Sequence, residues 1–271
     1  MNKRELENSI RESVLTGNGV IAPYVDLNGV MRDVRHSYSD DDTIIKYSKK
    51  EHSLVSSNPS DVLYLGTPKS YGDLNTDALV RDDSEGTFPE ELDWKNRGSE
   101  WMEAQKRSFL EISPDVHGYL KFKATMELPA YDLLYCTSID PLRKKKRQEQ
   151  MRKTNPSYDF MASIESPPTT FAKQLGVDLR KQIETDSTII VLHGPVIYLD
   201  GDKTSEFIVR SREKFSDTFP ITDTIPLFVK DKKYQVQQEY RFVVSTPHRQ
   251  RTNHILLNIS EDLRKLFSLV K

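Results

Sequence analysis

The most informative stretch of the sequence is Tyr234-Gln235-Val236-Gln237-Gln238-Glu239-Tyr240-Arg241-Phe242-Val243-Val244. If it forms a β-strand, side chains two residues apart share a face. One face then carries four polar side chains, while mostly apolar ones point the other way; the polar four are Gln235, Gln237, Glu239 and Arg241. An antiparallel strand with one solvated face shows the same pattern. The segment therefore predicts either a plain surface strand or a strand that presents a polar site.

Other strands and a few helices are expected around this segment. Short apolar runs predict strands at residues 62–65, 119–125, 133–138, 188–192, 196–199, 226–229 and 255–257. Helical spacing predicts helices at 4–15, from Thr169 or Thr170 as N-cap to Ile183, and from Ser260 through Phe267. Strands that follow one another with few intervening helices indicate an α+β fold with a mixed, mostly antiparallel sheet. We expect a helical N-terminal extension at 1–58 and one α+β domain at 59–271.

Composition indicates a folded protein of a reducing compartment. The chain has 271 residues, 36% of them hydrophobic, with 11 Phe and 12 Tyr to build a core. Its net charge of −2 gives no general attraction to nucleic acid or to anionic membranes. One cysteine, no signal-peptide pattern and no long apolar run lead us to expect a soluble, cytoplasmic protein without a membrane segment. Residues 71–100, with nine acids and three bases, are expected to form an irregular excursion.

Three short motifs carry a resemblance to a known superfamily. They are Leu63-Tyr64-Leu65-Gly66-Thr67, Tyr135-Cys136-Thr137-Ser138 and Gln237-Gln238-Glu239, in that order along the chain. They resemble the Gly-Thr strand end, the Ser-Thr-Ser strand and the Gln-x-Glu pattern of ADP-ribosyltransferases. Residues 62–245 also resemble a group of uncharacterised bacterial proteins. The resemblance implies the ADP-ribosyltransferase fold, NAD as co-substrate, and a toxin or phage-defence effector that an antitoxin or other regulatory protein controls.

The resemblance also implies roles for individual residues. Glu239 would be the catalytic carboxylate that stabilises an oxocarbenium-like transition state, and Gln237 would orient the acceptor. Thr67, Thr137 and Ser138 would contact the nicotinamide or hold the neighbouring strands. Leu65 stands where the superfamily usually has His or Arg, so Tyr71 or Arg81 would have to contact the co-substrate instead. Each Ser or Thr is equally compatible with an ordinary strand position, and Arg81 with an internal salt bridge.

A strongly basic segment follows the second motif. Residues 142–153 hold seven Lys or Arg and one Glu, and the densest part is Arg143, Lys144, Lys145, Lys146 and Arg147. Such a run is either a solvated helix surface or a site that contacts phosphates of RNA or DNA. It points to a nucleic-acid acceptor, with an acidic protein partner as the competing use.

The remaining chemistry-bearing residues favour no metal site. Asp82, Asp83 and Glu85 lack the spacing of a calcium loop, and the six histidines show no ligand spacing with Cys136. Cys136 lies in an apolar run and is expected in the core. The alternative to a transferase is a non-catalytic α+β module that recognises nucleic acid or a protein through its charged segments.

Overall fold

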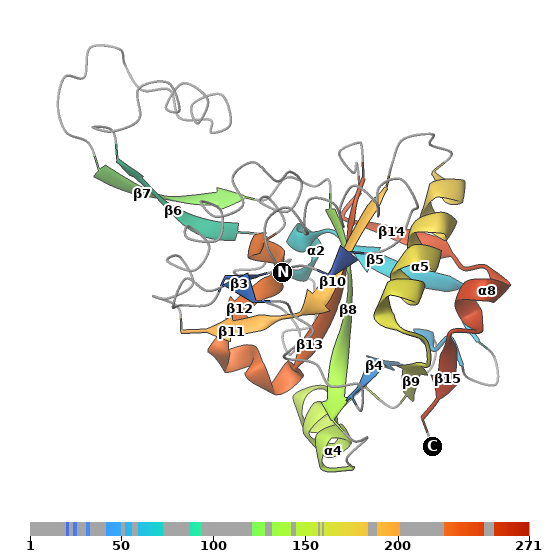
Figure 1. Ribbon diagram of the computed structural model, residues 1–271. Coiled ribbons are helices and arrows are strands. Elements are labelled where there is room, and N and C mark those ends of the chain that lie inside the picture. Colours follow the sequence, from blue (N-terminus) through green and yellow to red (C-terminus); the bar gives the residue numbers. More distant parts are fainter. Residues whose placement is uncertain are drawn as a thin grey trace.

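The computed structural model describes residues 20–21, 24–25, 31–32, 42–49, 52–55, 59–72, 87–93, 121–127, 132–141, 145–156, 158, 160–183, 189–200, 225–246 and 252–270. The fold is α+β, with one large, mostly antiparallel sheet and few helices (Figure 1). The expected α+β class with a mostly antiparallel sheet is thereby confirmed. The helix expected at 4–15 lies outside the described residues.

The main sheet has nine strands. Seven run in the order β1-β10-β13-β8-β4-β9-β15, and β14 joins through β5, which pairs with β8. Their bounds are β1 Val20–Ile21, β4 Asp42–Ser48, β5 Val62–Gly66, β8 Asp132–Pro141, β9 Phe160–Ile164, β10 Ile190–Pro195, β13 Glu239–Ser245, β14 His254–Asn258 and β15 Phe267–Leu269. Among the described strand pairs of this sheet, only β1–β10 is parallel.

The N-terminal part of the chain contributes to this sheet. Strand β4 lies between β8 and β9, and β1 pairs with β10. Ile44 and Ile45 of β4 are fully buried, because the strand is covered on both faces. The boundary expected at residue 58 therefore does not separate β4 from the rest of the core.

Strand β8 forks the sheet. One edge pairs with β13 along seven residues, from Asp132↔Ser245 to Ser138↔Glu239. The other edge is shared: β4 pairs with β8 only as far as Ile45↔Ser138, and β5 meets it only at Gly66↔Leu134. Figure 1 shows β4 and β5 at different ends of β8. The divergence of these two strands leaves a gap in the sheet beside the middle of β8.

Helix α5 (Pro168–Gln182) covers one face of the sheet. Its fully buried Phe171, Leu175 and Leu179 recur every four residues, as an amphipathic helix requires. The Phe171 ring packs against Phe242 of β13 at 4.7 Å between ring centroids. The helix begins after Pro167 without a side-chain cap, so the expected Thr169 or Thr170 cap is wrong. Pro168 at the first position has no N–H to satisfy, which reduces the need for one.

The C-terminal helix is shorter than expected. Ser260 is its N-cap, as predicted, and accepts a hydrogen bond from the Leu263 backbone N–H. Helix α8 spans only Glu261–Arg264, and Phe267 lies in β15. Phe267 is buried because β15 pairs with β9 at the edge of the sheet, a tertiary contact that overrides the helical spacing.

The smaller elements lie around this core. Helix α2 (Pro68–Gly72) follows β5, and α4 (Lys145–Thr154) follows β8. Three two-stranded sheets pair β2 (Tyr24–Val25) with β3 (Met31–Arg32), β6 (Thr87–Asp93) with β7 (Lys121–Glu127), and β11 (Ile197–Leu199) with β12 (Val229–Asp231). Part of the expected irregular excursion is thus strand β6. The expected strand at 226–229 is instead the 3-10 helix η4 (Ile225–Phe228), followed by β12.

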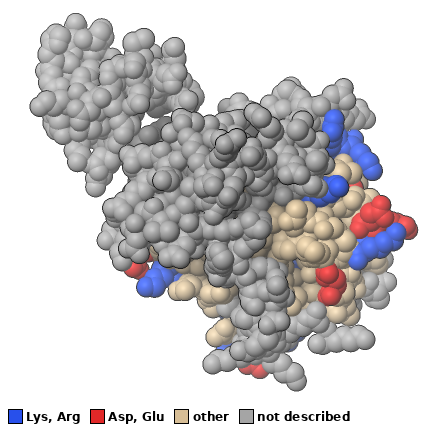
Figure 2. Space-filling model, viewed as in Figure 1, with Lys and Arg blue, Asp and Glu red and all other residues tan. Residues whose placement is uncertain are grey.

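The described surface shows no single dominant charge on the face seen in Figure 2, where acidic and basic side chains lie near one another. Lys265, directly after α8, is for example 3.3 Å from Asp262 and 3.9 Å from Glu261. No helix in the described ranges is long and apolar enough to cross a membrane.

Candidate functional site

A pocket of about 120 Å³ opens at the fork of the sheet. Its walls come from β4, α2, β8, α4, β12, β13 and the 3-10 helix η5 (Lys232–Gln237). Lining residues are Lys46, Tyr47, Tyr71, Cys136, Thr137, Ser138, Met151, Tyr158, Lys230, Gln237, Glu239 and Arg241. Five of the seven residues predicted to act in catalysis or co-substrate binding are therefore in one place. They come from segments that are up to 168 residues apart between Tyr71 and Glu239.

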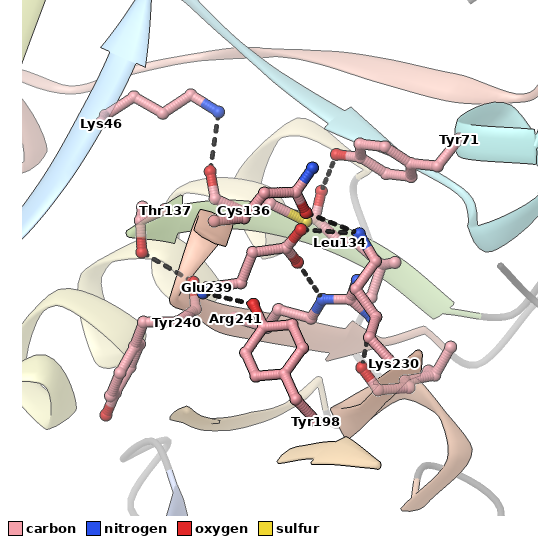
Figure 3. A network of polar contacts seen from close by, with 12 residues as sticks. Lys46, Tyr71, Leu134, Cys136, Thr137, Tyr198, Lys230, Glu239, Tyr240 and Arg241 are labelled. Carbon is pink, nitrogen blue, oxygen red and sulfur yellow. Dashed lines mark hydrogen bonds and ion pairs between the residues drawn. The ribbon is translucent and has the colours of Figure 1, made fainter. Parts of the chain in front are cut away.

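Glu239 lies at the centre of a buried charge cluster (Figure 3). Its Oε1 is 2.7 Å from Lys230 Nζ, and its Oε2 is 2.7 Å from Arg241 Nε. The side chains of Lys230, Glu239 and Arg241 are only 4%, 10% and 1% exposed. Burial by itself raises the pKa of Glu239, but the charges and hydrogen bonds of Arg241 and Lys230 outweigh it and bring that pKa to about 2. The carboxylate is ionised at neutral pH.

Strand alternation explains why Glu239 and Arg241 meet. Both project from the face of β13 opposite Tyr240 and Phe242, which pack in the core beneath α5. This part of the predicted polar strand face is confirmed. Arg241 is held further by a 2.6 Å hydrogen bond from its Nη1 to the Leu227 carbonyl. The site is thus rigidly attached to the central strands.

Gln237 reaches the cluster by another route than the one expected. Residues 232–237 form η5 instead of a strand, and Gln238 adopts a left-handed backbone conformation with φ of 45° before β13 begins. This turn lets Gln237 and Glu239 share one partner, since Lys230 Nζ also donates to Gln237 Oε1 at 3.1 Å. Gln235, expected on the same face, is exposed on η5.

Lys46 of β4 and Tyr71 of α2, the helix that follows β5, both approach β8 at the fork (Figure 3). Lys46 Nζ donates to the Cys136 carbonyl at 2.7 Å, and the Tyr71 hydroxyl donates to the Leu134 carbonyl at 3.2 Å. These contacts satisfy backbone acceptors on the edge of β8 where the strand pairing is interrupted. Loss of solvation lowers the pKa of Lys46, although the neighbouring Cys136 and Glu239 raise it in part. Burial is the main reason that the pKa of Tyr71 is raised.

Thr137 and Ser138 differ in their contacts. The Thr137 hydroxyl donates to the Tyr240 carbonyl at 2.7 Å and thereby ties β8 to β13. Ser138 faces Glu239 directly in the register of these two strands and is only 5% exposed. Within the described part of the chain its hydroxyl makes no hydrogen bond. Thr137 therefore has a structural contact, whereas the Ser138 hydroxyl remains available to a ligand.

The Gly-Thr motif acts through its glycine. A Cβ on Gly66 would lie 2.8 Å from Tyr71 Cε2 and would also clash with the Ser70 hydroxyl. Gly66 therefore allows α2 to fold back and place Tyr71 in the pocket. Thr67 does not line the pocket, because its hydroxyl donates to the Asn253 carbonyl at 3.1 Å. Leu65 is fully buried in the apolar core.

Several predicted residues lie beyond what the structure describes. Arg81, Arg143 and Lys144 are outside the described residues, and Lys145, Lys146 and Arg147 lie in α4 without described side chains. The same helix contributes Met151 to the pocket, and the next two residues, Arg152 and Lys153, are exposed. The basic segment thus continues to the rim of the pocket.

Lys46 and Lys230 line the pocket but were not among the predicted site residues. Cys136 was expected in the core, whereas it lines the pocket at intermediate exposure. A signal existed for Lys46, which is a single charge inside the apolar run Thr43-Ile44-Ile45-Lys46-Tyr47. A charge is rarely kept in a buried strand without a partner or a task. Lys230 had no such signal, because it follows an apolar run at a position that any surface lysine could occupy.

No protein-family model, characterised protein or solved structure matches the chain. Among the described residues no group of three or more His, Cys, Asp or Glu is placed to hold a metal ion.

Proposed function

We propose that this chain is an NAD-dependent ADP-ribosyltransferase whose active site is the pocket at the fork of the sheet. The observation that carries the proposal is the convergence of Tyr71, Ser138, Gln237 and Glu239 in that pocket. Two of the three motifs, which are separate in sequence, supply Ser138, Gln237 and Glu239, and Tyr71 follows the first motif by four residues. A chance resemblance would not require these side chains to meet. The fold agrees at the coarser level of a mostly antiparallel α+β sheet.

In the proposed reaction, the bond between the ribose C1 and the nicotinamide nitrogen breaks, and its electron pair leaves with nicotinamide. A nucleophile of the acceptor then forms a bond to C1 and releases its proton to water. Glu239 is ionised, so it can stabilise positive charge that develops on the ribose. Its pKa of about 2 makes it an electrostatic group and a poor general base at neutral pH.

The two ion pairs of Glu239 limit its ability to stabilise positive charge on the ribose. Lys230 and Arg241 together offset its negative charge in the structure without substrate. The carboxylate acts on the ribose only when Lys230 turns away from Oε1, since Arg241 is tied to the Leu227 carbonyl and stays in place. Lys230 is the movable partner because it is a flexible chain that donates from a single nitrogen.

The test is incubation with NAD labelled in its adenylate part, together with total cell extract. We expect transfer of label to protein or nucleic acid, and release of nicotinamide. Glu239→Gln should reduce transfer by at least 100-fold, in the range found when one transition-state contact is lost. Glu261→Gln, a change of the same kind at a side chain that is 89% exposed on α8, is the matched control and should transfer normally.

Because Glu239→Gln also affects stability, its activity is compared at a temperature where circular dichroism shows it folded. Gln237→Ala, which keeps both ion pairs of Glu239, provides a second variant. Absence of both label transfer and nicotinamide release from the unmodified protein would refute the proposal. Full activity of folded Glu239→Gln would remove the assigned role of Glu239.

One observation favours a second candidate, the non-catalytic binding module. Both carboxylate oxygens of Glu239 are satisfied within the protein, as in a structural ion-pair network. A module of this kind would bind NAD or nucleic acid without releasing nicotinamide. Binding of NAD that is unaffected by Glu239→Gln, with no turnover, would establish it.

The exposed Arg152 and Lys153 beside pocket-lining Met151 support a nucleic-acid acceptor. If phosphates run along α4, affinity for RNA should fall by orders of magnitude between about 50 and 200 mM salt. Exchange of Arg143, Lys144, Lys145 and Lys146 for Glu should weaken binding and transfer to RNA while the protein stays folded. Salt-insensitive binding would direct the search to a protein acceptor.

A further inference from the structure

The fork between β4 and β8 holds two hydrogen-bond donors that the described residues of the chain do not use fully. Lys46 follows Ile45, the last residue of β4 that pairs with β8, and Ser138 is the residue opposite Ile45. Both side chains line the pocket. The end of the strand pairing therefore brings an ammonium and a hydroxyl to the same place.

Lys46 has few protein partners for a cation in this position. Its Nζ donates to the Cys136 carbonyl at 2.7 Å and lies 4.8 Å from the centre of the Tyr135 ring. An ammonium has three N–H donors. Within the described part of the chain no carboxylate lies within ion-pair distance of Nζ. The nearby Glu239 is already held by Lys230 and Arg241.

Ser138 adds a second, independent observation. It is 5% exposed and lines the pocket, and its hydroxyl has no hydrogen-bond partner among the described residues. A nearly buried hydroxyl is normally hydrogen-bonded. A ligand that accepts hydrogen bonds would satisfy Ser138 and Lys46 together.

The charges select an anion as that ligand. Lys46, Lys230 and Arg241 line the pocket together with one carboxylate, Glu239. A positive group that is partly removed from water is stabilised by a negative ligand more strongly than it would be in bulk solvent. The cavity of about 120 Å³ corresponds to roughly four water molecules, so it is large enough to admit a phosphate group.

We propose that Lys46 and Ser138 form a subsite for a phosphate group in the part of the pocket where the β4–β8 pairing ends. The inference rests on the proposed function, which makes the ligand a nucleotide. It adds that a phosphate group of that nucleotide binds at the fork. Binding of the phosphate provides the negative charge toward which Lys230 can turn when it leaves Glu239.

The experiment measures binding of inorganic phosphate, ADP-ribose and NAD to the full chain by calorimetry at low salt, with chloride as the background anion. Lys46→Met keeps the length of the side chain and removes its charge, Lys46→Arg keeps the charge, and Ser138→Ala removes the hydroxyl. Lys265→Met, at an exposed side chain directly after α8, is the matched control. Each variant is first shown to be folded by its melting temperature.

We expect Lys46→Met to weaken binding of the phosphate ligands by roughly 10- to 150-fold, as for a hydrogen bond to a charged group. Ser138→Ala should weaken it less, and Lys46→Arg and Lys265→Met should retain it. Binding of inorganic phosphate alone would identify a free phosphate as the ligand, whereas binding only of ADP-ribose and NAD would identify the nucleotide as its source. Either result supports the subsite.

Unchanged binding in Lys46→Met, or no binding of any of the three ligands, would overturn the subsite. The proposed function fails separately. Phosphate binding that depends on Lys46, without nicotinamide release from NAD, would keep the subsite and refute the transferase. Label transfer that persists unchanged in Lys46→Met would support the transferase and refute the subsite.

Discussion

Glu239→Gln should destabilise the protein in a pH-dependent way. The ordinary carboxyl pKa of 4.5 falls to about 2 in the folded protein. A difference of roughly 2.5 units at about 1.36 kcal/mol each gives on the order of 3 kcal/mol of stability from the ionised carboxylate. Breaking a buried ion pair from one side costs about 3–5 kcal/mol in general, because the remaining charges lose their partner.

The sign follows from the direction of the shift. A lowered carboxyl pKa stabilises the fold above pH 4.5, and this contribution is lost as the pH falls from 4.5 toward 2. The difference in unfolding free energy between the unmodified protein and Glu239→Gln should therefore be about 3 kcal/mol at pH 7. It should shrink to less than half of that at pH 3.

Urea unfolding at the two pH values, followed by circular dichroism, provides the measurement. With a slope of about 3 kcal/mol per molar urea, the midpoint at pH 7 should fall by about 1 M. Glu261→Gln, at an exposed side chain, should change the unfolding free energy by less than about 1 kcal/mol at either pH. Equal midpoints for Glu239→Gln and the unmodified protein at pH 7, or a difference that does not change with pH, would refute the reasoning.

Two further changes probe the elements that support the site. Gly66→Ala should lower the free energy of unfolding by about 1–3 kcal/mol, because its new methyl group meets the Tyr71 ring, and it should also weaken NAD binding. Thermal unfolding and calorimetry measure the two effects. A fully stable variant that binds NAD normally would contradict this role of Gly66. His193, whose pKa burial lowers to about 3, must remain neutral in the fold, so stability is lost as the pH falls below 6.5. The unmodified protein should lose about 2 kcal/mol more between pH 7 and pH 5 than His193→Gln does, and equal losses in urea unfolding would show that His193 does not contribute.

Local sequence patterns determined much of the fold class and some of the site. The apolar runs of β5, β8 and β14 and the four-residue spacing in α5 predicted their elements, because burial imposes these periods on a chain. Glu239 and Arg241 were placed on one face by the two-residue period of a strand. Gln237 and Glu239 were singled out by a three-residue motif, which needs no knowledge of distant segments.

Tertiary structure decided where these elements meet. The order of strands in the main sheet joins segments distant in sequence, and β4 lies inside this sheet although it precedes the expected domain boundary. No local pattern specifies that β4 and β5 diverge along β8, since the pairing of an edge depends on which strands reach it during folding. That divergence leaves room for the pocket and places Lys46 in it, while β12 brings Lys230 to Glu239. Long-range packing therefore decided which charged side chains surround Glu239. Local patterns within single segments do not predict such packing.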